Sequence, residues 1–254
     1  PRVLQRHPGG VADFAAVGAG RAIQAPRRRG KYLWLPFADG DALVAHLGMS
    51  GQFRVDDAGQ PLPTHCRVVF EFADGGPQLR YVDQRMFGRL WLSADGAEGP
   101  AELAHIAADL FDPLLDRNAL VATIRSRTSG IKRVLLNQEI VSGIGNIYAD
   151  EALWAAKLHY ETAAHRLSGA RVRQVLSAAT TVMTAALAEG GTSFDALYVN
   201  VNGSSGYFGR SLTVYGRADL PCLRCGRPIV REPFMNRSSY RCPRCQPPPG
   251  VAGG

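Results

Sequence analysis

Residues 137–151 read NQEIVSGIGNIYADE, and this stretch organises the middle of the chain. Apolar residues recur with helical spacing on both sides of it, over 131–138 and 147–157, and Gly143-Ile144-Gly145-Asn146 interrupts that pattern. Glycines let a backbone approach a phosphate closely, and the helix that follows offers free N–H groups at its N-terminus. A tight connection between two helices explains the same residues equally well, so this turn alone does not establish anion binding.

Helical patterns continue outward from this stretch. Asp116 is a suitable N-cap for a helix over 117–125, and Ser168 for a long helix over 170–188 that ends at Gly190-Gly191. Before Gly99-Pro100 the pattern is one of short apolar runs bounded by turn signals, which is typical of a sandwich or barrel. These runs cover residues 31–37, 42–47, 66–72, 79–82 and 89–92.

Cysteine spacing gives the strongest local signal. Cys222-x2-Cys225 and Cys242-x2-Cys245 are separated by sixteen residues, enough for a two-stranded hairpin. In a chain with no secretion signal this pattern predicts one structural zinc ion bound by four thiolates, and a pair of disulfides is the alternative. Iron could also occupy a four-thiolate site. The fifth cysteine, Cys66, is expected to be a buried apolar residue.

Composition narrows the class of protein. The 254 residues are 46% hydrophobic and 20% charged, which argues against wholesale disorder. No run of about 18 apolar residues occurs and the start has no apolar signal core, so we expect a cytoplasmic chain without a membrane span. Of the net charge of +7, +6 falls in residues 200–254, where every cation is an arginine. This favours a polyanionic partner, with a solubilising basic surface as the alternative.

Four motifs together resemble one family of DNA-repair enzymes. Residues 137–151 are similar to the helix–two-turn–helix of bacterial formamidopyrimidine-DNA glycosylases, the Fpg/Nei family. His46-Leu47-Gly48-Met49-Ser50-Gly51 and Asp83-Gln84-Arg85-Met86-Phe87-Gly88 resemble two further motifs of that family. The cysteine-rich segment, with Asn236-Arg237-Ser238 before Cys242, resembles its zinc ribbon. The motifs occur in the family's order over essentially the whole chain.

The resemblance implies an α+β multi-domain protein. Such a protein would have an N-terminal β-sandwich over 1–97, a helix–two-turn–helix domain over 98–190, and a C-terminal zinc-ribbon β-hairpin over 217–246. Residues 191–216 would form a linker and the loop that closes over a flipped base, and 247–254 a disordered tail.

It also implies which side chains act on DNA. Met49, Arg85 and Phe87 match a wedge that fills the space left by an everted base, where the guanidinium addresses the orphaned cytosine. Core packing is the alternative for Met49 and Phe87. Lys31 and Arg237 match residues that contact phosphate and assist catalysis. His65, Arg127, Lys132 and Asn146 match DNA-backbone contacts.

Two positions depart from the family pattern. Family members begin Pro-Glu-Leu-Pro-Glu, and the proline amine attacks the sugar C1′, but this chain begins Pro1-Arg2-Val3-Leu4 with no adjacent carboxylate. Pro1 is therefore not assigned as the nucleophile, and we expect either a chain that starts late or a non-catalytic relative. Met86 stands where the family usually has a second arginine, which removes at most one DNA contact.

The resemblance implies an enzyme that excises oxidised purines, such as 8-oxoguanine and formamidopyrimidines, and cleaves the abasic site by β- and δ-elimination. Damaged double-stranded DNA would be the partner, the protein a monomer, and its location the cytoplasm, with the nucleoid. The chain as written is expected to bind damaged DNA but to cleave it poorly. A non-catalytic sensor of damaged or abasic DNA is the second hypothesis. A zinc-ribbon transcription or RNA-binding factor is the third, and it leaves the motifs at 46–51 and 83–88 unexplained.

Overall fold

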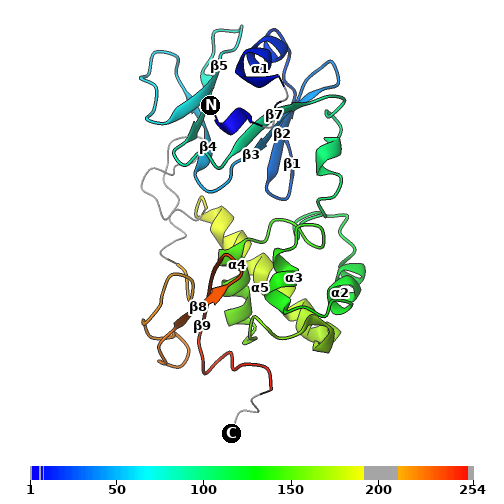
Figure 1. The fold of residues 1–254 in the computed structure, drawn as a ribbon, viewed down its shortest axis with the longest axis vertical. Coiled ribbons are helices and arrows are strands. Elements are labelled where there is room, and N and C mark those ends of the chain that lie inside the picture. Colours follow the sequence, from blue (N-terminus) through cyan, green and yellow to red (C-terminus); the bar gives the residue numbers. More distant parts are fainter. Residues whose placement is uncertain (1, 6, 8, 192–210, 251–254) are drawn as a thin grey trace. The chain divides into compact units, whose positions relative to one another are not determined.

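The computed structural model describes residues 2–5, 7, 9–191 and 211–250 (Figure 1). Backbone contacts divide the chain into two compact units, which we call unit 1, within Pro1–His105, and unit 2, within Ile106–Gly191 and Phe208–Gly254. Among the described residues, no helix is both long enough and apolar enough to cross a membrane.

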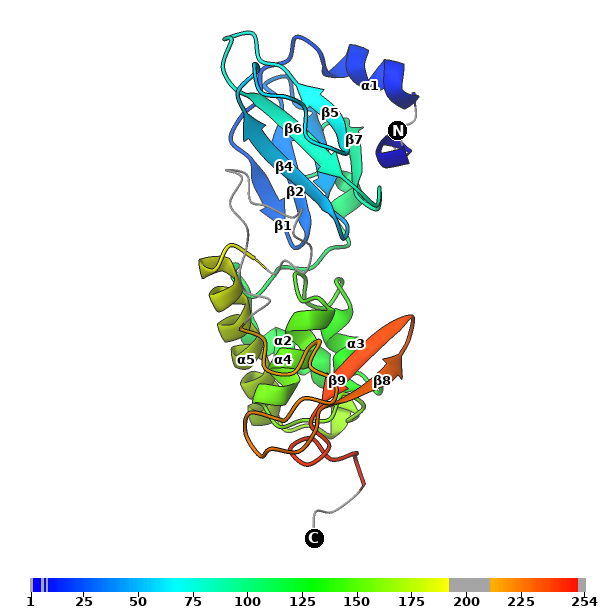
Figure 2. The same cartoon turned by 90° about the vertical axis from the view of Figure 1, so that its left-hand side faces the viewer.

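Unit 1 is a sandwich of two antiparallel sheets, as predicted from the sequence (Figure 2). The four-stranded sheet has the order β1-β2-β3-β7, formed by Arg27–Arg29, Tyr32–Pro36, Ala42–His46 and Arg89–Ser93. The three-stranded sheet has the order β4-β6-β5, formed by Gly51–Asp56, Gln78–Asp83 and Cys66–Phe70. Apolar side chains of both sheets meet in one core: Leu35, Leu43 and Leu90 from the first, Phe53 and Tyr81 from the second.

A short helix that the sequence reasoning missed completes this core. Helix α1 spans Gly10–Gly18 and inserts Phe14, which is 6% exposed, among the residues of the sandwich. The 3-10 helix η1, Arg2–Leu4, adds Val3 and Leu4 to the same core. With one deeply buried residue in nine, α1 lacks the apolar stripe by which an amphipathic helix is recognised in a sequence.

Backbone contacts assign the described residues up to His105 to unit 1. The segment that follows β7 turns back through the 3-10 helix η2, Ala101–Leu103. Ser93 Oγ at the end of β7 donates a hydrogen bond to Glu102 Oε2 over 2.7 Å. The break in composition at Gly99-Pro100 therefore marks a turn inside the unit.

Unit 2 is built on the predicted helices. They are α2, α3, α4 and α5, at Arg117–Arg125, Ile131–Leu136, Asn146–Ala155 and Gly169–Ala188, with the 3-10 helix η3 at Ala164–Arg166. The expected caps are present, since Asp116 accepts hydrogen bonds from the N–H groups of Asn118 and Ala119, and Ser168 from that of Arg171. The helices share a core that includes Ile131, Leu135, Ile144, Leu153 and Val175.

The zinc-ribbon segment forms the predicted hairpin in unit 2. Strands β8, Val230–Phe234, and β9, Arg237–Arg241, pair antiparallel and are joined by the two-residue turn Met235-Asn236 (Figure 2). Cys225 precedes β8 and Cys242 follows β9, so the metal-ligand candidates lie at the base of the hairpin. Arg237 lies at its turn end.

Candidate functional site

The two predicted wedge segments are neighbours because of the sandwich topology. Residues 47–50 lead from β3 to β4, and residues 84–88 lead from β6 to β7, so both cross from one sheet to the other. His46 is paired with Arg89 in one sheet, and Gly51 with Asp83 in the other. Both crossings therefore lie side by side at the same end of the sandwich, and we call them the wedge loops.

The wedge loops expose the three predicted side chains. Met49 is 69% exposed and Phe87 is 49% exposed, and Arg85 is exposed as well. Core packing, the alternative interpretation of Met49 and Phe87, is therefore excluded for both. Met86, at a positive φ of 54°, is half-buried and packs against the sandwich core, which leaves its two neighbours outside.

A buried carboxylate fixes both wedge loops. Asp83 is 0% exposed, and its Oδ1 accepts hydrogen bonds from Ser50 Oγ over 2.6 Å and from the Met86 N–H over 3.0 Å. Its Oδ2 accepts one from the Gly88 N–H over 2.8 Å. Ser50 Oγ in turn accepts one from the Arg85 N–H over 3.0 Å. One side chain thus ties the backbone that carries Arg85 and Phe87 to the loop that carries Met49.

Gly48 is required where the loops touch, and its replacement by alanine is expected to destabilise unit 1. Its φ is +65°, and an added Cβ would lie 2.6 Å from the backbone carbon of Phe87. A left-handed conformation combined with a backbone clash costs roughly 2–4 kcal/mol. Gly59→Ala is the matched control, because a Cβ there meets nothing within 4 Å. Urea unfolding monitored by circular dichroism measures both, and equal stabilities for the two variants would contradict this packing.

Lys31 and His65 lie at the same end of the sandwich. Lys31 is exposed in the two-residue turn between β1 and β2, and the next residue, Tyr32, is paired with His46. The His65 carbonyl accepts a hydrogen bond from the Asp83 N–H over 3.1 Å, just before β5. All five sequence-predicted residues of unit 1 are thus gathered at one end of it. Pro1 and residues 192–209 of the predicted capping loop lie outside the described residues.

In unit 2 the structure places Asn146 against the zinc hairpin. Asn146 is the first residue of α4, and its Nδ2 donates a hydrogen bond to the Ser238 carbonyl over 2.9 Å. Its Oδ1 is buried and accepts no hydrogen bond from the described residues. Asn146 thereby binds the backbone of Ser238, the residue that follows Arg237 in β9.

Lys132 does not lie at the surface, where the sequence predicted it. Its side chain is 0% exposed, and Nζ lies 2.6 Å from Asp150 Oδ1. The ammonium also lies 4.6 Å from the centre of the Phe234 ring. The structure therefore shows contacts inside unit 2 in place of the predicted direct contact with a DNA phosphate. The reason is that α3 directs this side chain toward the hairpin and not into solvent.

The two arginines of unit 2 that are predicted to bind DNA are exposed. Arg237 is exposed, and its Nε donates a hydrogen bond to Asn236 Oδ1 over 3.2 Å. Arg127 is exposed on the loop after α2, and no hydrogen bond or ion pair within the described part of the chain joins it to Asn146 or Arg237. One arginine of the basic segment, Arg241, is only 8% exposed and pairs with Glu232. It therefore belongs to the hairpin's own structure.

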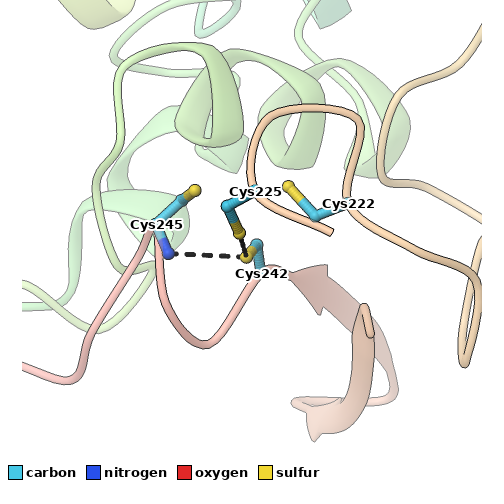
Figure 3. Close-up of side chains that lie close together, drawn as sticks. All are labelled: Cys222, Cys225, Cys242 and Cys245. Carbon is cyan, nitrogen blue, oxygen red and sulfur yellow. Dashed lines mark hydrogen bonds between the residues drawn. The ribbon is translucent and has the colours of Figure 1, made fainter. Parts of the chain in front are cut away.

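The four predicted metal ligands converge (Figure 3). The sulfurs of Cys222, Cys225, Cys242 and Cys245 all lie within 4.8 Å of one another. Thiolates around one tetrahedral zinc ion, at a Zn–S distance of about 2.3 Å, are separated by roughly 3.8 Å, so the cluster fits such an ion.

The surroundings of this cluster suit thiolates. The indole N–H of Trp154 donates to Cys222 Sγ over 3.4 Å, and the Cys245 N–H donates to Cys242 Sγ over 3.4 Å. Donors directed at sulfur stabilise its anionic form. Arg224 stacks on Trp154 with 4.0 Å between the guanidinium carbon and the ring centre, which attaches the metal segment to α4. The zinc that the sequence predicts would be held here, where it fixes the base of the hairpin.

The alternative of two disulfides is not observed. All five cysteines are free, and the 3.4 Å between Cys225 Sγ and Cys242 Sγ is well beyond the length of an S–S bond, about 2.05 Å. Cys66 is half-buried in β5, and burial raises the pKa of its thiol. It is more accessible than the buried residue expected from the sequence.

Sequence reasoning missed three buried acids inside the quoted motifs. Besides Asp83, they are the neighbours Asp150 and Glu151, which are 1% and 3% exposed. The Glu151 carboxylate accepts hydrogen bonds from the N–H groups of Val214 and Tyr215, both over 2.8 Å. The signal available in the sequence was the pair of consecutive acids, Asp150 and Glu151, within an otherwise largely apolar helix. Carboxylates need hydrogen-bonding partners when they are buried, so such a pair points to contacts with other segments of the chain.

Comparison with known proteins agrees with this organisation. Residues 1–90 match the family model described as the formamidopyrimidine-DNA glycosylase N-terminal domain, and residues 106–196 match its H2TH domain. Residues 219–248 match a zinc finger found in FPG and IleRS. The formamidopyrimidine-DNA glycosylase of Salinispora arenicola is 58% identical over 249 residues, which cover 98% of this chain and 87% of that protein. The enzyme of the same name from a Nocardioides strain is 59% identical, over 98% of this chain and 85% of its own length.

Solved structures give the same result. The Lactococcus lactis Fpg in complex with DNA containing an abasic site is 30% identical, with a TM-score of 0.80 over 96% of this chain and 90% of that one. A MutM complex with DNA containing carbocyclic 8-oxo-G is 31% identical, with a TM-score of 0.77 over 90% and 83% of the two chains. The matches cover both units and the zinc segment, and they show that the chain belongs to the formamidopyrimidine-DNA glycosylase family.

Proposed function

We propose that this protein recognises oxidised purines, such as 8-oxoguanine and formamidopyrimidines, in double-stranded DNA. It everts the damaged base, removes it and cleaves the resulting abasic site by β- and δ-elimination. Relatives that bear the name of this enzyme match 98% of the chain at 58% and 59% identity, which favours an enzyme over a non-catalytic sensor. The amine that attacks the sugar is not assigned to a residue.

The wedge loops carry the proposal. Met49 and Phe87 are large apolar side chains, 69% and 49% exposed, on a backbone that the buried Asp83 holds in place. Apolar groups presented to solvent on a rigid support are a feature of binding surfaces. Inserted into a duplex they replace the stacking of an everted base, and Arg85 between them offers hydrogen-bond donors to the unpaired cytosine.

The remaining residues bind the DNA backbone. Lys31 and His65 lie at the same end of unit 1 as the wedge loops, and Lys31 assists catalysis beside the phosphate it contacts. In unit 2, Asn146, Arg127 and Arg237 bind phosphates, and Arg237 assists the last elimination. We place the protein with the chromosomal DNA and expect one copy to act alone, because a single chain supplies all of these residues.

Phe87→Ala is expected to weaken binding to a duplex with a single abasic site by roughly 5- to 30-fold, since stacking of an aromatic ring on a base contributes about 1–2 kcal/mol. Phe72→Ala is the matched control, because Phe72 is also exposed on unit 1, at 39%, but lies outside the wedge loops. A 2-aminopurine next to the lesion reports local unstacking by its fluorescence. We expect the fluorescence rise on binding to be lost with Phe87→Ala and retained with Phe72→Ala. Equal behaviour of the two variants would contradict the wedge.

A further inference from the structure

Unit 2 contains an ion pair that is closed to solvent. Lys132 of α3 and Asp150 of α4 are 0% and 1% exposed at their side chains, with 2.6 Å between Nζ and Oδ1. Burial lowers the pKa of Lys132 and raises that of Asp150 to about 6, and each group opposes the shift of the other. Two charges withdrawn from water are expensive to maintain, and a well-packed apolar pair is often no less stable. The pair therefore calls for an explanation other than stability.

The other contacts of Asp150 all go to β9 of the zinc hairpin. Its Oδ1 accepts a hydrogen bond from Ser239 Oγ over 2.9 Å, and its Oδ2 accepts one from the Tyr240 N–H over 3.0 Å. Ser239 is itself 0% exposed. Asp150 is thus held by one ammonium and two donors of a single strand.

Its neighbours on the helices hold the preceding residue of the same strand. The Ser238 carbonyl accepts hydrogen bonds from Asn146 Nδ2 over 2.9 Å and from Lys132 Nζ over 3.4 Å. Asn146 and Asp150 are one helical turn apart on α4 and so share a face of it. Three consecutive residues, Ser238 to Tyr240, are therefore fixed by this face and by Lys132.

Arg237 is the residue immediately before this fixed segment. The metal ligands act at the other end of the hairpin, where Cys242 follows β9, five residues beyond Arg237. A zinc ion at the base acts five residues from Arg237, whereas Asp150 holds the strand two residues from it, at Ser239. The exposed Arg237 is then presented from a strand that is held against the same face of α4 as Asn146.

We propose that Asp150, with Lys132 as its counter-ion, is a positioning residue for DNA binding that holds the strand carrying Arg237 against α4 without touching DNA itself. This inference rests on the proposed function. It gives Lys132 an indirect role in place of the phosphate contact predicted from the sequence. The two ends of the hairpin then have different supports. The zinc ion stabilises the base, and the buried Asp150 carboxylate fixes the orientation of the turn end.

A double-mutant cycle in the 254-residue chain tests the inference. The Kd for a duplex with an abasic-site analogue is measured by fluorescence anisotropy at several salt concentrations. The four proteins are the parent, Asp150→Asn, Arg237→Ala and the double variant. We expect Asp150→Asn to weaken binding by about 10-fold and to lower the salt slope by about 0.9, as for the loss of one phosphate contact. In the Arg237→Ala background we expect it to weaken binding by less than about 2-fold.

Two further variants keep the test decisive. Ser239→Ala removes one hydrogen bond to Asp150 without leaving a charge unpaired, so it replaces Asp150→Asn if that variant does not fold, and we expect the same pattern with a smaller loss. Asp109→Asn is the control, because Asp109 is a buried acid of unit 2 whose Oδ1 bonds the Phe111 N–H. We expect it to leave the salt slope unchanged. Each variant should retain one metal ion per chain.

The outcomes separate the two claims. Equal fold-losses for Asp150→Asn with and without Arg237, or an unchanged salt slope, would show that Asp150 serves stability alone and would overturn the inference. A parent chain that binds the abasic and the intact duplex equally well would instead refute the proposed function.

Discussion

Replacing Cys225 with serine is expected to reduce the affinity for abasic-site DNA to its non-specific level, a loss of roughly 10³-fold or more. A four-thiolate site that loses one ligand binds zinc poorly, and small zinc-bound segments unfold without metal. The core at the base of the hairpin includes the ligands Cys222 and Cys242 themselves together with Val214 and Ile229, so this base depends on the metal. Arg237 then loses the support that comes from the base of the hairpin and keeps only the contacts of β9 with α3 and α4.

Unit 1 is expected to stay folded in the same variant, because its core of residues from both sheets contains no metal ligand. Hydrogen exchange followed by mass spectrometry checks this directly: amides of β2 and β3 should stay protected while those of β8 and β9 exchange rapidly. Cys66→Ser is the matched control, since it removes the one cysteine outside the cluster. Metal analysis of the parent should find one zinc, or iron at the same site, per chain. Full DNA binding by a metal-free Cys225→Ser protein would contradict the role given to the hairpin.

Arg237→Ala is expected to weaken binding to abasic-site DNA by roughly 10- to 150-fold, because a hydrogen-bonded contact between a guanidinium and a phosphate contributes about 1.5–3 kcal/mol. The loss should be similar for lesions of different chemistry, since a phosphate carries no information about the base. The slope of log Kd against log salt concentration should fall by about 0.9, which corresponds to one phosphate.

Two companion variants define what Arg237 contributes. Arg237→Lys keeps the charge but loses the two-pronged geometry, so we expect an intermediate loss with an unchanged salt slope. Arg227→Ala removes another exposed arginine of the same zinc segment, and we expect it to change the affinity by less than about 2-fold. A loss for Arg227→Ala as large as that for Arg237→Ala would mean that general positive charge, and not this position, binds the DNA.

The elements with local signals could be predicted from the sequence. Asp116 and Ser168 cap α2 and α5 as expected, and the cysteine spacing placed both the metal cluster and the hairpin between its halves. Strand β4 and helix α1 were missed, because β4 has only Phe53 and Val55 as alternating apolar residues and α1 has one deeply buried residue, so both depend on packing within the sandwich. Local periodicity does not report such tertiary support.

The candidate site also combines residues that local motifs identify with contacts that depend on packing between distant segments. Met49, Arg85 and Phe87 were identified from motifs, but their adjacency follows from strand pairing between residues far apart in the chain, such as His46 with Arg89. The burial of Lys132 was not foreseeable, because its partner Asp150 is 18 residues away and the hairpin that covers it is about a hundred residues further on. A lysine in a DNA-binding motif is expected at the surface unless the sequence also reveals its counter-ion.

The most direct test of this account is the ratio of two dissociation constants for the parent chain, measured by anisotropy at physiological salt. One duplex contains an abasic-site analogue opposite cytosine, and the other has the same sequence with an intact base pair. We expect the abasic duplex to bind roughly 10³-fold more tightly, since the wedge loops gain their contacts only where a base is missing or everted. Equal dissociation constants for the two duplexes would contradict the account.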